Sequence, residues 1–89
     1  MPNVRYAAHF AEDVAAIYSS RVLTELDRRL AAIEAFPCMG SEDLPESLVL
    51  KFGPGIRRFP VPPFVIVYRY IEEDDLLEFL ALPYDKTVE

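Results

Sequence analysis

Several residue types are scarce in this 89-residue chain, and each scarcity excludes a class of protein. Its one cysteine, Cys38, cannot form an internal disulfide, which is typical of proteins kept in a reducing cytoplasm. Its one histidine, His9, has no second histidine or cysteine at ligand spacing, so the sequence predicts no metal site and no cofactor. No apolar run approaches the ~18 residues that cross a membrane, and no signal peptide is apparent. We therefore expect a cytoplasmic protein without a membrane segment.

Length and composition predict one small domain that spans residues 1–89. The chain is 52% hydrophobic and 27% charged, which is ordinary for a globular fold and too apolar for a disordered chain. A domain of this size can bury only a modest core. We therefore expect a partner to cover part of its apolar surface.

Basic residues are outnumbered, and they are unevenly distributed. The chain has 9 basic and 15 acidic side chains, and its net charge of −6 argues against a general nucleic-acid binder. Residues 1–50 and 70–89 are both net acidic. Residues 51–69 form the only basic segment, which contains no acid and holds Lys51, Arg57, Arg58 and Arg69.

The first part of the chain is poor in helix breakers. Residues 1–36 contain no glycine and one proline, so this part can be helical. The pattern predicts a short strand over residues 4–8, a helix over 10–19 and a second helix from about 20 to 35. The second helix has an apolar stripe formed by Leu23, Leu26, Leu30 and Ile33. Because the connection is short, we expect an antiparallel helical hairpin.

From residue 37 onward, glycine and proline divide the chain into short segments. Strand-like runs occupy residues 47–52, 56–61, 64–71 and 76–82, separated by "GPG", "PP" and "EEDD". Such short connectors predict antiparallel neighbours. The predicted fold class is therefore α+β: a short N-terminal strand, an antiparallel helical hairpin and a four-strand antiparallel meander.

Three side chains are candidates for binding or catalysis, namely Arg57, Arg58 and Tyr84, and each has two interpretations. The two arginines point to opposite faces of their strand. One of them could bind phosphate or stabilise transition-state charge, or both could be solvated, with one paired to an acid. Tyr84 could be a general acid–base assisted by Arg57 or Lys86, or an aromatic packed over the core edge.

In order and spacing, the motifs of the chain resemble those of the RelE/ParE superfamily, the toxins of type II toxin–antitoxin modules. "FAEDVAAIY" is similar to the first helix of that family, and "AIEAFPCMG" to the exit from its second helix. "GPGIRRFPV" resembles its glycine–x–arginine strand, and "PFVIVYRY" the strand that follows. The resemblance covers nearly the whole chain and leans towards the ParE-like branch.

This resemblance implies a bacterial toxin of the plasmid-stabilisation type that inhibits growth and is neutralised by a cognate antitoxin protein. Two targets stay open: DNA gyrase, poisoned as by ParE, or ribosome-bound mRNA, cut by an RNA endonuclease as by RelE. The resemblance makes Arg57, Tyr84 and Lys86 the candidate catalytic residues. It also places Arg57 in the cleft, which leaves Arg58 on the face that meets the helices.

The sequence departs from the mRNA-cutting members in two respects. Tyr84 stands where such toxins usually carry a histidine, and the chain is acidic overall. Both departures favour gyrase poisoning, which needs no catalytic set. The alternative is a catalytically inactive toxin relic that acts as a binding or autoregulatory protein. Whether the chain forms a homo-oligomer is left open.

Overall fold

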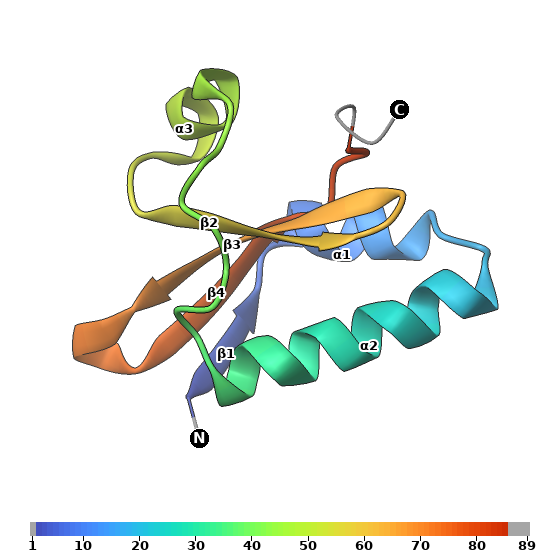
Figure 1. Ribbon diagram of the computed structural model, residues 1–89, viewed down its shortest axis with the longest axis horizontal. Helices are drawn as coiled ribbons and strands as arrows, with labels where there is room; N and C mark the ends of the chain where they lie inside the picture. Colours follow the sequence, from blue (N-terminus) through green and yellow to red (C-terminus); the bar gives the residue numbers. More distant parts are fainter. Residues whose placement is uncertain (1, 86–89) are drawn as a thin grey trace.

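The computed structural model describes residues 2–85, and Figure 1 shows the order of its elements. The first three are β1 (Asn3–Tyr6), α1 (Ala8–Ala15) and α2 (Ser20–Ala35). A short helix, α3 (Glu46–Phe52), precedes β2 (Ile56–Val61) and β3 (Phe64–Ile71). A 3-10 turn, η1 (Glu72–Asp74), leads into β4 (Leu76–Ala81).

The four strands form one mixed sheet in the order β1-β4-β3-β2. β2 with β3, and β3 with β4, pair antiparallel, as the sequence predicts. β1 pairs parallel with β4, with Val4 opposite Leu77. The predicted α+β class is therefore confirmed. The predicted four-strand antiparallel meander was wrong, because only three of its strands form and the N-terminal strand takes the fourth place in the sheet.

Residues 47–52, predicted as a strand, form helix α3 instead. Pro45 precedes the helix, Glu46 lies in its first turn and Lys51 in its last, an arrangement that complements the helix dipole. Gly53 ends it with a φ of 88°, a conformation that glycine adopts without strain. Arg69 in β3 donates a hydrogen bond to the carbonyl of Phe52, at the last turn of α3.

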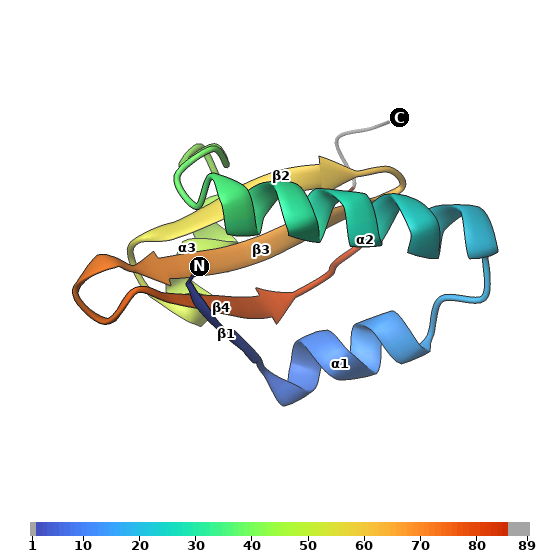
Figure 2. The same cartoon turned by 90° about the horizontal axis from the view of Figure 1, so that it is seen from below.

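The sheet separates two apolar clusters of different size. The larger cluster lies between the sheet and the helices α1 and α2, and it contains the bulkiest fully buried side chains, among them Tyr68, Phe79, Ile33, Ile66 and Leu77. The smaller one lies under α3 and is formed by Ile56, Val67 and Ala81, with Leu44, Leu48, Val49 and Phe52 packed against it. In Figure 2, α2 therefore lies in front of the sheet and α3 behind it.

The helices α1 and α2 follow one another as predicted, but they pack against different strands. α1, which begins and ends earlier than the predicted residues 10–19, packs on β4, whereas α2 packs on β2. The Ser19 hydroxyl accepts a hydrogen bond from the Val22 amide and so caps the start of α2. In Figure 2 the two helices diverge from their connection, with α2 in front of the sheet and α1 below β4. Over residues 2–85, no helix is both long and apolar enough to cross a bilayer.

Candidate functional site

Arg57 lies on the face of β2 that meets α2, where it holds the loop that leaves this helix. Its guanidinium donates to the carbonyl oxygens of Cys38 (3.1 Å) and Gly40 (2.9 Å). It also lies 3.0 Å from a carboxylate oxygen of Glu42, and only 22% of the side chain is exposed. The geometry therefore gives Arg57 a structural task, which is to fasten the α2 exit loop to the sheet.

Arg58 occupies the opposite face, so the predicted orientation of the two arginines was wrong. It alternates with Ile56, which lies in the cluster under α3. Phe59 and Val61 point into the larger core. Because residues 57, 59 and 61 lie on the same face of the strand, Arg57 also points to that side. Within residues 2–85, the Nε atom of Arg58 is buried without a hydrogen-bond partner.

Tyr84 lies away from Arg57. Its ring is 62% exposed and rests edge-on against Phe64, with 5.9 Å between ring centroids. Phe64 pairs with Val61 at one end of the β2–β3 ladder, whereas Arg57 pairs with Tyr68. Those positions on β3 are about 13 Å apart at the usual rise of a strand. The structure does not bring Arg57 and Tyr84 together, and Lys86 lies outside the described residues.

Tyr68, which no sequence motif singled out as a functional residue, contacts the α2 exit loop from the larger core. Its buried hydroxyl donates to the Pro37 carbonyl at 2.8 Å and accepts from the Gly40 amide at 2.9 Å. Burial raises the pKa of Tyr68, while the Gly40 hydrogen bond and the charge of Arg57 oppose that rise. Tyr68 and Arg57 together hold the segment "PCMG" at the end of α2.

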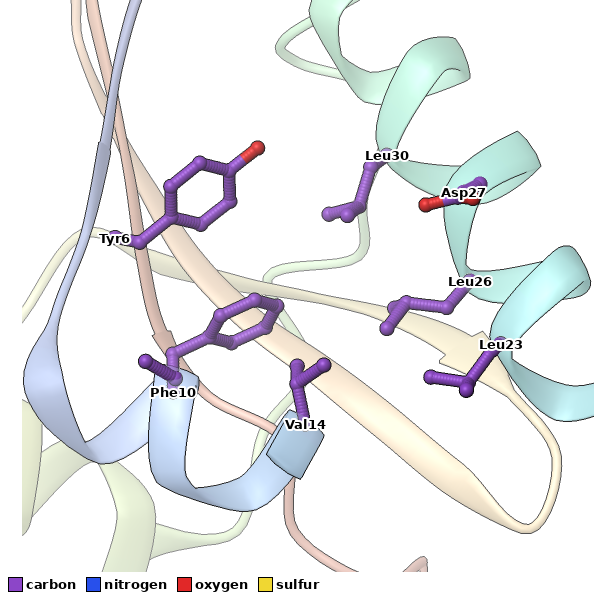
Figure 3. A pocket seen from close by; sticks show the side chains of 8 residues that line it. Tyr6, Phe10, Val14, Leu23, Leu26, Asp27 and Leu30 are labelled. Carbon is purple, nitrogen blue, oxygen red and sulfur yellow. The ribbon is translucent and has the colours of Figure 1, made fainter. Parts of the chain in front are cut away.

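An open apolar groove separates α1 from α2 (Figure 3). Its buried floor includes Phe10 and Leu26, each 2% exposed. Half-buried aliphatic side chains from both helices point across it, namely Val14, Leu23 and Leu30. Tyr6, from β1, stacks on Phe10 with 5.7 Å between ring centroids. The sequence predicted the apolar stripe on α2 but not this gap, which exists because the two helices pack on different strands.

A second hollow continues along α2 and is more acidic than the first. It is lined by Pro2, Ala31, Glu34, Ala35, Pro37, Tyr70 and Asp75. The first hollow contains one charged residue, Asp27. Burial raises the pKa of the Tyr6 phenol, and the nearby carboxylates of Glu34 and Asp27 raise it further. Neither Asp27 nor Glu34 forms an ion pair with another residue in the described part of the chain.

In the described residues, the histidine and a neighbouring acidic side chain have structural contacts. Over residues 2–85, no cluster of three or more histidine, cysteine or acidic side chains is placed to hold a metal ion. The one histidine, His9, lies 3.7 Å from Asp13. Asp13 accepts a hydrogen bond from the Leu82 amide at 2.9 Å and so ties α1 to the segment after β4.

Comparison with known proteins identifies the family. The sequence matches the family described as "ParE toxin of type II toxin-antitoxin system, parDE" over residues 4–86. The chain therefore belongs to the ParE toxin family, and it is the toxin component of a type II toxin–antitoxin module. This confirms the superfamily that the sequence motifs indicate. No curated protein sequence matches the chain.

Solved structures share the fold at low sequence identity. The toxin–antitoxin complex RelBE of E. coli contains a chain that is 14% identical, with a TM-score of 0.72 over 97% of this chain and 99% of that one. Isolated E. coli RelE is 11% identical, with a TM-score of 0.75 over 97% and 86%. E. coli YafQ is 18% identical, with a TM-score of 0.66 over 99% and 98%. At these identities the likeness establishes the fold alone.

Proposed function

We propose that this toxin stops growth by binding a protein target, DNA gyrase, rather than by cutting mRNA. The separation of Arg57 from Tyr84 carries the proposal, because phosphodiester cleavage needs its acid, base and cations around one phosphate. Arg57 is also occupied by two carbonyls and a carboxylate. The net charge of −6 further disfavours contact with ribosomal RNA.

Removing the hydroxyl of Tyr84 tests this mechanism directly. Tyr84→Phe keeps the ring that packs on Phe64 but removes any proton transfer. We expect growth arrest after induced expression to be unchanged, as it should be for the matched control Tyr18→Phe, whose ring is 94% exposed. Plasmid supercoiling and mRNA integrity, measured in the same cells, identify the target.

Three results of this experiment would change the proposal. If Tyr84→Phe alone relieves growth arrest while the protein stays folded, the phenol takes part in chemistry and the RelE-like mechanism is favoured. Cleaved mRNA with normal supercoiling would point the same way. Normal growth on expression of the unmodified chain, with antitoxin binding retained, would support the toxin relic.

We also propose that the cognate antitoxin places a helical segment in the groove between α1 and α2. The groove supplies preformed apolar surface in a chain too small to bury all of its own. The RelBE structure shows a toxin of this fold in complex with an antitoxin. The segment would lie across Val14 and Leu23, with its apolar side against Phe10.

Charged substitutions on the two walls test where the antitoxin binds. We expect Val14→Asp and Leu23→Asp to weaken antitoxin binding by about tenfold or more, since each puts a carboxylate into apolar contact. Leu50→Asp is the matched control, because Leu50 is 78% exposed on α3, behind the sheet. Calorimetry gives the affinities, and thermal unfolding shows that each variant is folded. Equal affinity for all three variants would place the antitoxin elsewhere.

A further inference from the structure

The groove and the second hollow lie next to each other along α2, where Leu30 lines the first and Ala31 the second, and they differ in charge. The groove is mainly apolar with one carboxylate, Asp27, whereas the second hollow is lined by Glu34 and Asp75. Asp27 and Glu34 are seven residues apart, so they lie on the same side of α2 and about 10.5 Å apart along its axis. Ala31, which lies between them, is small and leaves the space open. Together the groove and the second hollow therefore place two carboxylates, Asp27 and Glu34, along one side of α2.

These two carboxylates have no counter-charge in the described part of the chain. By contrast, the third acid on this helix, Glu25, pairs with Arg28 and Arg29. Asp75, which lines the second hollow with Glu34, accepts a hydrogen bond from the Tyr70 hydroxyl at 2.6 Å and is a third negative group. The α1 wall contributes only uncharged side chains, namely Phe10, Ala11 and Val14.

A segment that covers the groove must therefore compensate these negative charges. Covering Asp27 and Glu34 removes water from them, and a carboxylate that loses water without gaining a partner opposes binding. A cation on the incoming segment offsets that loss. An acid there would place like charges together and be rejected.

We infer that the groove selects a basic amphipathic helix, with lysine or arginine two turns apart on the side that meets α2. The inference rests on the proposed antitoxin site and adds to it the chemistry of the segment that binds. The apolar face of this helix fills the end near Leu23, and its cations reach Asp27 and Glu34. The net charge of −6 also attracts such a segment from a distance.

Two synthetic peptides test the selection independently of the antitoxin itself. Both are amphipathic helices with the same apolar face, and they differ only in carrying lysine or glutamate at two positions seven residues apart. We expect the lysine peptide to bind the full chain about tenfold more tightly than the glutamate peptide. The preference should shrink when salt is raised, because partly exposed charges are screened.

A double charge reversal supplies the decisive comparison. The variant D27K/E34K should reverse the preference, so that the glutamate peptide binds more tightly. The variant D43K/E46K makes the same change in net charge near α3, on the far side of the sheet, and should keep the preference of the unmodified chain. Calorimetry with all four combinations separates local pairing from total charge.

Several outcomes would overturn the inference. These are equal affinity for the two peptides, binding of neither, or the same loss of preference in both charge variants. Self-association of the unmodified chain that D27K/E34K abolishes would assign the groove to a second copy instead. If Val14→Asp and Leu23→Asp weaken antitoxin binding but D27K/E34K does not, the proposed site stands and only the charge selection fails.

Discussion

Arg57, a candidate catalytic residue by sequence, has a structural role in the folded protein. Two carbonyl oxygens and the Glu42 carboxylate surround its guanidinium, and together with Tyr68 it fixes the loop after α2. A planar fork that is always charged suits this task, because it donates to several oxygens at once. Strand alternation predicts that Arg57 and Arg58 point to opposite faces of the sheet. It does not predict that the carbonyl groups of the loop after α2 lie beside Arg57.

Removing the Arg57 side chain should destabilise the fold. We expect Arg57→Ala to lower the free energy of unfolding by about 2 kcal/mol, since hydrogen bonds to a charged group contribute about 1.5–3 kcal/mol. Arg28→Ala is the matched control: its side chain is 73% exposed and pairs with the surface residue Glu25, so its loss should cost under about 0.5 kcal/mol. Denaturant titration measures both. Equal stability of the two variants would contradict the structural role of Arg57.

Tyr70 should make stability depend on alkaline pH. Its hydroxyl donates to the Asp75 carboxylate, and chiefly this hydrogen bond raises the pKa of Tyr70 to about 12. Because the folded-state pKa lies above that of the unfolded chain, the stabilisation is present below about pH 10 and is lost as pH rises through about 12. Phenolate absorbance during a pH titration should show a component near 12 that Tyr70→Phe removes.

Asp75→Asn provides the control for this titration. Asp75 has a φ of 46°, and asparagine tolerates that left-handed conformation, so the turn should be kept while the negative charge is lost. We expect the pKa of Tyr70 to fall towards the ordinary value of about 10. An unchanged titration curve in both variants would show that the hydrogen bond does not govern the phenol.

At the scale of elements, the sequence predicted the last three strands nearly to the residue. β2 and β3 have the predicted bounds, and β4 ends one residue early, because prolines, glycines and acidic turns mark their ends. Helix α3 was missed because "SLVLKF" is apolar at alternate positions and also at helical spacing. The structure shows that the helical spacing is the one realised, because Leu48, Val49 and Phe52 pack inwards while Leu50 is 78% exposed.

The apolar stripe of α2 should carry much of the stability. Leu26 is 2% exposed in the larger core, so we expect Leu26→Ala to cost roughly 2–5 kcal/mol, the range for truncating a buried leucine. Leu50→Ala, the same substitution on exposed α3 surface, should change stability by less than about 0.5 kcal/mol. Denaturant titration of both variants makes the comparison. A loss under about 1 kcal/mol for Leu26→Ala would contradict the packing described for α2.

At the scale of the whole molecule, the groove between α1 and α2 could not be predicted from the sequence. Its walls come from α1 and α2, and its width depends on which strand each helix covers. The parallel pairing of β1 with β4 matters here, because it brings Tyr6 beside Phe10 and Phe79 at the base of the groove. Periodicity identifies the buried face of a helix, but not the distance between two helices on one sheet.

The two edges of the sheet differ, and the difference bears on aggregation. At the β2 edge, Ser41 and Arg58 exchange backbone hydrogen bonds of 2.9 and 2.8 Å, so part of that edge is already paired. At the other edge, no strand among residues 2–85 covers the outer side of β1. An exposed strand edge invites pairing with another chain. Two copies joined through β1 would form a closed pair whose outer edges are the two β2 strands, and the Ser41 bridge on each of them leaves less free edge for a further copy.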